Sequence, residues 1–169
     1  MISIRKEHNE KIFSGVKKWE GRKTLPKCVK VANYIDPTST YNKSASDVRF
    51  YIYEPKTGGG CGKVVGEFTC DFAQVFLRTG LCFPDFEVIA KALCVSVDFA
   101  KKYFDGKRGY MIRVCAPKKY DEPKELSAFE YACDDSQFCP TCRYHIPGTF
   151  TCDHTISKAP QSWCYVEEL

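Results

Sequence analysis

The sequence of 169 residues lacks any long hydrophobic run. No stretch approaches the ~18 consecutive apolar residues that a membrane-spanning helix needs. An apolar signal-peptide core is also missing at the N-terminus, because Arg5, Lys6 and Glu7 follow directly on the first four residues. We therefore expect neither a helical membrane protein nor a secretory leader, and we expect a cytoplasmic location.

Internal repeats and a dividing linker are missing too, so the length predicts a single domain over residues 1–169. Hydrophobic residues make up 44% and aromatic residues 14%, which is typical of a globular protein. The net charge is only +4, but residues 1–30 carry nine Lys/Arg against three Glu, and residues 121–169 carry three against nine acidic residues. A basic N-terminal segment favours a phosphate-bearing partner. A solvated charged face is the alternative.

The alternation of apolar and polar residues predicts more strands than helices. We expect a helix over residues 8–14 that Gly15 ends, and a second helix near residue 97 that Ser96 caps. The predicted segments are strands at 17–23, 28–35, 48–53, 63–77, 110–115 and 162–166, a helical insertion at 83–109, an irregular polar connection at 118–126, and a cysteine-rich loop at 130–158. This content predicts an α+β, mainly β protein, and a closed or nearly closed barrel would remove the exposed strand edges.

The first candidate site is the G-x-K-x-x-E-x-R pattern of residues 15–22. Lys17 and Arg22 can neutralise phosphates, and Arg22 can also pair with a base edge. Glu20 can accept a hydrogen bond from a base amino group or hold Arg22 in place. Trp19 could offer a stacking surface, but we expect it in the core. The plain structural alternative for the whole pattern is an ion pair on a strand.

The second candidate site lies in the cysteine-rich loop. Cys139 and Cys142 have the Cys-x-x-Cys spacing of a zinc knuckle, in which one tight turn presents two thiolates to a tetrahedral ion. Cys133 and Cys152 are the best remaining pair, and His154 can substitute for one of the four. The sequence therefore predicts a structural Zn²⁺. A redox Cys-x-x-Cys and plain free thiols are the alternatives, and the redox motif expects a βαβ context that is missing here.

Two other segments are weaker candidates. The glycine-rich segment at 57–64 fails the Walker A pattern at both ends, because Thr57 stands where Gly is needed and Val64 where Ser or Thr is needed. We expect a hairpin turn there. Glu67 lies in the middle of a predicted strand, and we expect it to pair with Arg22.

The pieces together resemble an ASCH domain, a family of the PUA-like barrel group. The resemblance covers most of the chain and is carried in order by the N-terminal strand, helix and G-x-K-x-x-E-x-R pattern, by VGEF at 65–68, by KYDEP at 119–123 and by APQSWCY at 159–165. It implies a β-barrel with a cleft beside the N-terminal helix, to which the cysteine-rich loop is an addition.

What the resemblance implies for function is binding of RNA, single-stranded in our expectation, or of a modified nucleotide. Carried over to this chain, Lys17, Glu20 and Arg22 line the cleft, and Gln161 and Ser162 border it.

Two alternatives stay open. Some members of the family are similar to amidohydrolases of acylated cytidine, and others to ribonucleases. In such an enzyme Lys17 would be central, but Lys18 stands where the amidohydrolases have Thr. The second alternative is a protein-interaction domain that uses the cysteine-rich loop and the helical insertion.

Overall fold

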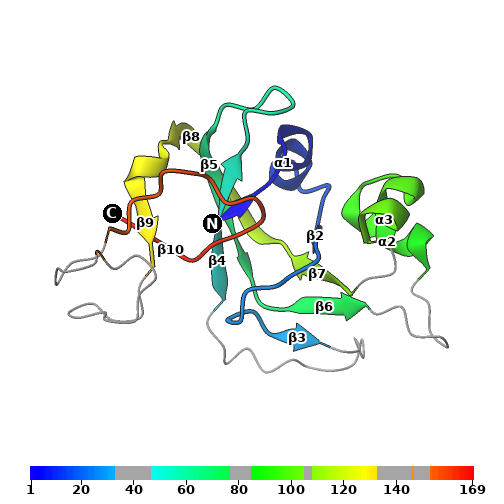
Figure 1. The fold of residues 1–169 in the computed structure, drawn as a ribbon. Coiled ribbons are helices and arrows are strands. Elements are labelled where there is room, and N and C mark those ends of the chain that lie inside the picture. Colours follow the sequence, from blue (N-terminus) through cyan, green and yellow to red (C-terminus); the bar gives the residue numbers. More distant parts are fainter. Residues whose placement is uncertain (33–46, 77–84, 105–107, 133–145, 147–152) are drawn as a thin grey trace.

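The computed structural model describes residues 1–32, 47–76, 85–104, 108–132, 146 and 153–169. In these ranges the chain folds mainly into β-strands, and three α-helices accompany them (Figure 1). No helix within these ranges combines the length and the apolar character that crossing a membrane requires.

The first sheet has the order β1-β4-β5-β8. It consists of β1 (Ile2–Ser3), β4 (Val48–Glu54), β5 (Lys63–Cys70) and β8 (Cys115–Lys124). The short β1 runs parallel to β4, and the other neighbours are antiparallel. This sheet therefore joins the beginning of the chain to its middle.

The second sheet has the order β2-β7-β6-β3. It consists of β2 (Trp19–Arg22), β7 (Gly109–Arg113), β6 (Ala73–Phe76) and β3 (Val31–Ala32). β5 continues into β6, and β7 continues into β8, while β5 pairs with β8 and β6 with β7. One bent hairpin thus runs through both sheets, and the main core of Ile52, Phe68 and Ile112 lies where they meet.

Helices and a small third sheet complete the fold. α1 (Lys6–Phe13) packs against the first sheet, and α2 (Phe86–Leu93) and α3 (Val97–Phe104) form a pair beside β2. The 3₁₀ turn η1 (Leu126–Ala128) precedes β9 (Phe129–Tyr131), which pairs with β10 (Val166–Glu168). Figure 1 shows the α2–α3 pair and the β9–β10 pair at opposite ends of the molecule.

These observations confirm a mainly β fold with an N-terminal helix. Gly15 follows α1 with a φ of +74°, as expected for a glycine that ends a helix. The backbone N–H of Phe99 donates to Ser96 Oγ at 3.2 Å, so Ser96 caps α3 as predicted. Among the described residues the strands form three sheets and no closed barrel, and barrel closure stays a prediction.

The prediction of an irregular connection at 118–126 was wrong, because most of that segment belongs to β8. β8 is an edge strand whose residues are mostly exposed. Its side chains are therefore mostly polar, and its sequence lacks the apolar–polar alternation from which a strand is predicted. An edge also tolerates Pro117 and Pro123, since a proline cannot donate to a neighbouring strand. Ala116 has a φ of +44°, next to an irregularity in the β5–β8 register.

Two further expectations have clear outcomes. The glycine-rich segment forms the turn between β4 and β5, with positive φ at Gly58, Gly59 and Gly62. The expected pairing of Glu67 with Arg22 was wrong. The Tyr120 hydroxyl donates to Glu67 Oε2 at 2.7 Å, and burial together with this carboxylate raises the pKa of Tyr120. Glu67 of β5 therefore forms a side-chain hydrogen bond to the neighbouring strand β8.

Candidate functional site

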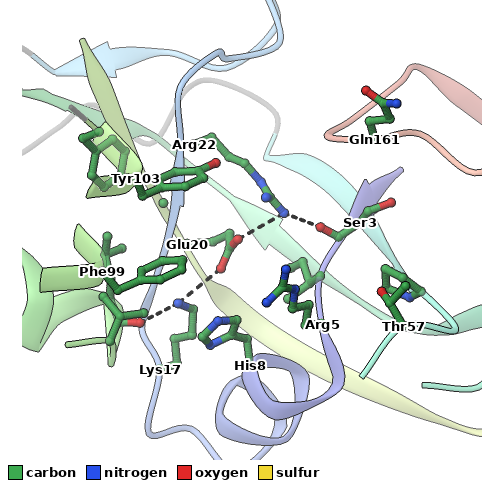
Figure 2. A pocket seen from close by; sticks show the side chains of 16 residues that line it. Ser3, Arg5, His8, Lys17, Glu20, Arg22, Thr57, Phe99, Tyr103 and Gln161 are labelled. Atoms are coloured by element: carbon green, nitrogen blue, oxygen red, sulfur yellow. Dashed lines mark hydrogen bonds and ion pairs between the residues drawn. The ribbon is translucent and has the colours of Figure 1, made fainter. Parts of the chain in front are cut away.

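A pocket of about 420 Å³ opens between α1, β2 and the α2–α3 pair (Figure 2). Its polar lining residues come from the N-terminal segment, from the β4–β5 turn, from α3 and from the segment before β10. They are Ser3, Arg5, His8, Lys17, Glu20, Arg22, Thr57, Tyr103 and Gln161. The volume is within the range of sites for small ligands, about 300–1,000 Å³.

Three charged side chains form a continuous network in the pocket wall. Lys17 Nζ lies 3.3 Å from Glu20 Oε2, and Arg22 Nη2 lies 3.1 Å from Glu20 Oε1. Lys17 is 3% exposed, Glu20 5% and Arg22 11% in its side chain. Buried charges need partners of opposite charge. Glu20 provides one carboxylate oxygen to each of the two cations, so all three charges are paired.

The network ends on two backbone carbonyls. Lys17 Nζ donates to Leu93 O at 2.6 Å, and Arg22 Nη2 donates to Ser3 O. Leu93 is the last residue of α2, so the Lys17 ammonium lies at the negative end of that helix. The ion network therefore ties β1, β2 and α2 together (Figure 2).

The local sequence explains how these side chains converge. After Gly15 turns the chain, the Lys17 N–H donates to Lys11 O at 2.8 Å, which directs Lys17 back beneath α1. In β2, residues two apart share a face of the strand. Glu20 and Arg22 therefore face the pocket together, as the alternation of residues 17–23 predicted.

Two polar atoms of the network have no hydrogen-bond partner among the described residues. They are Glu20 Oε2, which has Lys17 Nζ only as an ion-pair neighbour at 3.3 Å, and Arg22 Nε. One is an acceptor and the other a donor, and both side chains line the pocket. The network therefore leaves one acceptor and one donor unsatisfied in the wall of the pocket.

His8 adds a titratable group to the same pocket. Burial lowers the pKa of His8, and the nearby Lys17 ammonium lowers it further. The imidazole is therefore neutral at pH 7. Its buried Nδ1 has no hydrogen-bond partner among the described residues. His8 thus offers a neutral polar edge to a ligand and adds no charge to the network.

Two aromatic rings of α3 form another part of the pocket wall. Phe99 and Tyr103 stack with ring centroids 5.7 Å apart and planes 8° from parallel. Phe99 is 46% exposed, although it is a large apolar side chain. Lys23 Nζ lies 4.8 Å from the Tyr103 ring centroid, as in a cation–π contact. The pocket therefore combines a flat apolar wall with a charged one, which suits a planar polar ligand.

Four of the five binding residues predicted from the sequence line the pocket, and one does not. Lys17, Glu20, Arg22 and Gln161 line the pocket. Ser162 does not line it; its carbonyl accepts a hydrogen bond from the Ser3 N–H at 3.0 Å. The binding roles of all five stay predictions.

Trp19 packs against the cluster that contains Phe76, Leu93 and Phe104, as expected for a core residue. Phe99, Tyr103, Arg5 and His8 line the pocket but were not candidates. The spacing of four residues between the two aromatics was visible in the sequence. It indicated only that both rings share one face of a helix.

The predicted zinc ligands Cys133, Cys139, Cys142 and Cys152 lie outside the described residues. Within the described part of the chain, no group of three or more His, Cys, Asp or Glu side chains is arranged to hold a metal ion. The buried Cys70 is a core residue, and burial raises the pKa of its thiol to about 12. It is therefore not a thiolate at neutral pH.

No protein-family model matches the chain, and no curated protein matches it. Among solved structures, the chain is similar to ASCH from Zymomonas mobilis, with 18% identity, a TM-score of 0.48 and coverage of 74% of this chain and 71% of that one. The chain is also similar to a serine-to-alanine mutant of that protein, with 18% identity, a TM-score of 0.47 and coverage of 74% of this chain and 72% of the mutant. A tyrosine-to-phenylalanine mutant gives the same identity and TM-score, with coverage of 74% of this chain and 73% of the mutant. These structures carry the name of the family that the sequence motifs resemble.

Proposed function

We propose that this protein binds RNA, or a single nucleotide, by taking one base into the pocket between α3 and β2. The observation that carries the proposal is that the stacked Phe99 and Tyr103 rings and the Lys17–Glu20–Arg22 network line one and the same pocket. A nucleobase has an apolar face and a polar edge, and this pocket matches both.

The unpartnered atoms support a base as the occupant. Glu20 Oε2 is an acceptor for a base amino group, and the Arg22 guanidinium can donate to a ring nitrogen or carbonyl oxygen. The base must leave its stack to reach them, which favours a single strand over a duplex. Arg5 at the rim of the pocket can then neutralise a phosphate of the same nucleotide.

Phe99→Ala is the variant that tests this proposal. We expect the affinity for a short single-stranded RNA to fall about 5- to 150-fold, because base stacking on an aromatic ring contributes about 1–3 kcal/mol. Phe99 is half exposed, so the melting temperature should change little. Fluorescence anisotropy titration measures the affinity, and circular dichroism measures the melting.

Val88→Ala is the matched control for Phe99→Ala. Val88 is an apolar residue of α2, is 64% exposed and does not line the pocket. Its removal should leave RNA affinity unchanged. Equal affinities of wild type and Phe99→Ala for RNA would contradict the proposal.

A catalytic role is less well supported by the geometry. A lysine that acts as a nucleophile or base needs a free lone pair. The Lys17 ammonium instead has a carbonyl and a carboxylate as partners. Lys17 is therefore better placed to order the pocket than to react, and we propose binding rather than hydrolysis.

We also propose that Cys133, Cys139, Cys142 and Cys152 hold one structural zinc ion, with His154 as a substitute ligand. The described flanks bring the two ends of this segment together, since the Tyr131 N–H donates to His154 O at 2.8 Å and Glu130 pairs with Thr155. A metal ion bound by these thiolates would contribute to the folding of this part of the chain.

Metal analysis of the purified protein tests the zinc site. We expect one zinc per chain, and removal by a chelator should lower the melting temperature because metal binding contributes to folding. Replacing the exposed Cys28 or Cys61 by Ser should leave the zinc content unchanged. A folded, metal-free preparation would rule the site out.

A further inference from the structure

We propose that the base pocket is the middle of a three-nucleotide groove for single-stranded RNA, which curves around the first turn of α1. This inference rests on the proposed function, because it takes the pocket as the site of one base. What it adds is the class of ligand, a strand of at least three nucleotides in place of a free nucleotide, and the side chains that hold its flanking parts.

The groove consists of the central pocket and two neighbouring hollows. One hollow, of about 270 Å³, shares His8, Val95 and Phe99 with the central pocket. The other, of about 340 Å³, shares Arg5 and Thr57 with it. The three cavities therefore adjoin one another, and a ligand that leaves the central pocket can continue on either side.

A cation is present in each flanking hollow. Lys11 lines the first hollow, and its Nζ is held near the end of α2 by a hydrogen bond to Cys94 O at 3.1 Å. Arg5 is exposed and lies where the second hollow meets the central pocket. The phosphates before and after a bound base would thus each meet a fixed positive charge, as a strand requires.

The charges of the whole groove also favour a polyanion. Four fixed cations line the three cavities, namely Arg5, Lys11, Lys17 and Arg22, against the two carboxylates Glu7 and Glu20. Glu20 is neutralised within the buried network. Glu7 is the exception, because its side chain is 64% exposed and borders both flanking hollows but not the central pocket.

The aromatic wall extends the base-binding surface into the first flanking hollow. Phe99 lines both this hollow and the central pocket. A second base can therefore contact the rim of the same ring that stacks on the first. Alternating cations and an aromatic ring are typical of grooves that bind single strands with little dependence on sequence.

The test compares ligands of different length on the full chain. Affinities of the four nucleoside monophosphates and of a mixed-sequence RNA trinucleotide are measured by calorimetry or fluorescence anisotropy at several salt concentrations. We expect the trinucleotide to bind at least about tenfold more tightly than any monophosphate, because the flanking contacts become intramolecular. A trinucleotide that binds no more tightly than a monophosphate overturns the groove and leaves the base pocket standing.

Two variants change only the flanking hollows. Lys11→Gln should weaken trinucleotide binding, reduce the slope of log affinity against log salt by about 0.7, and leave monophosphate binding unchanged. Glu7→Gln should tighten trinucleotide binding by about two- to fivefold, since it removes a repelling charge. A gain in affinity cannot arise from misfolding, so the second variant keeps the test decisive if the first is unstable.

The control and the remaining outcomes separate the two proposals. Lys118→Gln removes an exposed charge that lines none of the three cavities, and it should change neither affinity. Unchanged trinucleotide binding in both groove variants contradicts the groove alone. Absence of binding to every monophosphate and to the trinucleotide contradicts the base pocket itself. A poly-glutamate peptide that binds more tightly than the trinucleotide would point to an acidic protein partner and also overturn the inference.

Discussion

Glu20→Ala is expected to destabilise the protein by about 3–5 kcal/mol, because it leaves two buried cations without their shared carboxylate. Lys17 and Arg22 would each keep one backbone carbonyl as an acceptor, which does not balance a full positive charge. For a chain of this length the loss corresponds to a melting temperature lower by roughly 6–20 °C. Thermal and urea denaturation followed by circular dichroism measure it.

The controls for Glu20→Ala separate the buried network from the loss of any acidic residue. Glu122→Ala removes an exposed carboxylate of β8 and should change the free energy of unfolding by less than about 0.5 kcal/mol. Adding Lys17→Met to Glu20→Ala should cost less than the sum of the two single changes, because one unbalanced charge disappears. Full stability of Glu20→Ala would contradict a buried ion network.

Gly66→Ala is expected to destabilise the protein by about 1–3 kcal/mol or more, as overpacking of a tight contact does. A Cβ at this position would lie 2.3 Å from Lys118 O and 2.7 Å from Phe13 Cζ. The first atom is backbone of the neighbouring strand β8, and the second belongs to α1. The substitution would therefore push apart the sheet and the helix whose first turn forms the pocket.

Gly21→Ala is the comparison for Gly66→Ala. The nearest atom to its Cβ is Leu93 Cδ1 at 2.7 Å, the end of a side chain that can rotate away. Its cost in the free energy of unfolding should therefore be the smaller of the two. The same denaturation curves measure both variants. A Gly66→Ala protein as stable as Gly21→Ala would show that β8 and α1 do not pack on β5 in this way.

Much of the N-terminal site was predictable because its residues are close in the sequence. Alternation in β2 places Glu20 and Arg22 on one face, and the positive φ of Gly15 follows from its position after a helix. The burial of Lys17 was not predictable. It depends on the carbonyl of Leu93, which lies 76 positions further along the chain.

The aromatic part of the site also depends on contacts between residues that are far apart in the sequence. The periodicity of α3 indicates an apolar face that contains Phe99 and Tyr103, but it does not show what that face contacts. Both Phe99 and Phe104 line the pocket, but Phe104 is 1% exposed, whereas Phe99 is 46% exposed. Only the packing of α3 beside β2 distinguishes these two phenylalanines. β8 escaped prediction because a mostly exposed edge strand needs little apolar alternation.

The crystal structure of the protein bound to the RNA trinucleotide tests the central claim most directly. We predict one base in the pocket, with its face parallel to the Phe99 ring and its polar edge at Glu20 and Arg22. The flanking phosphates should lie near Arg5 and Lys11. A trinucleotide bound at any other surface, with the pocket free of it, would contradict the account.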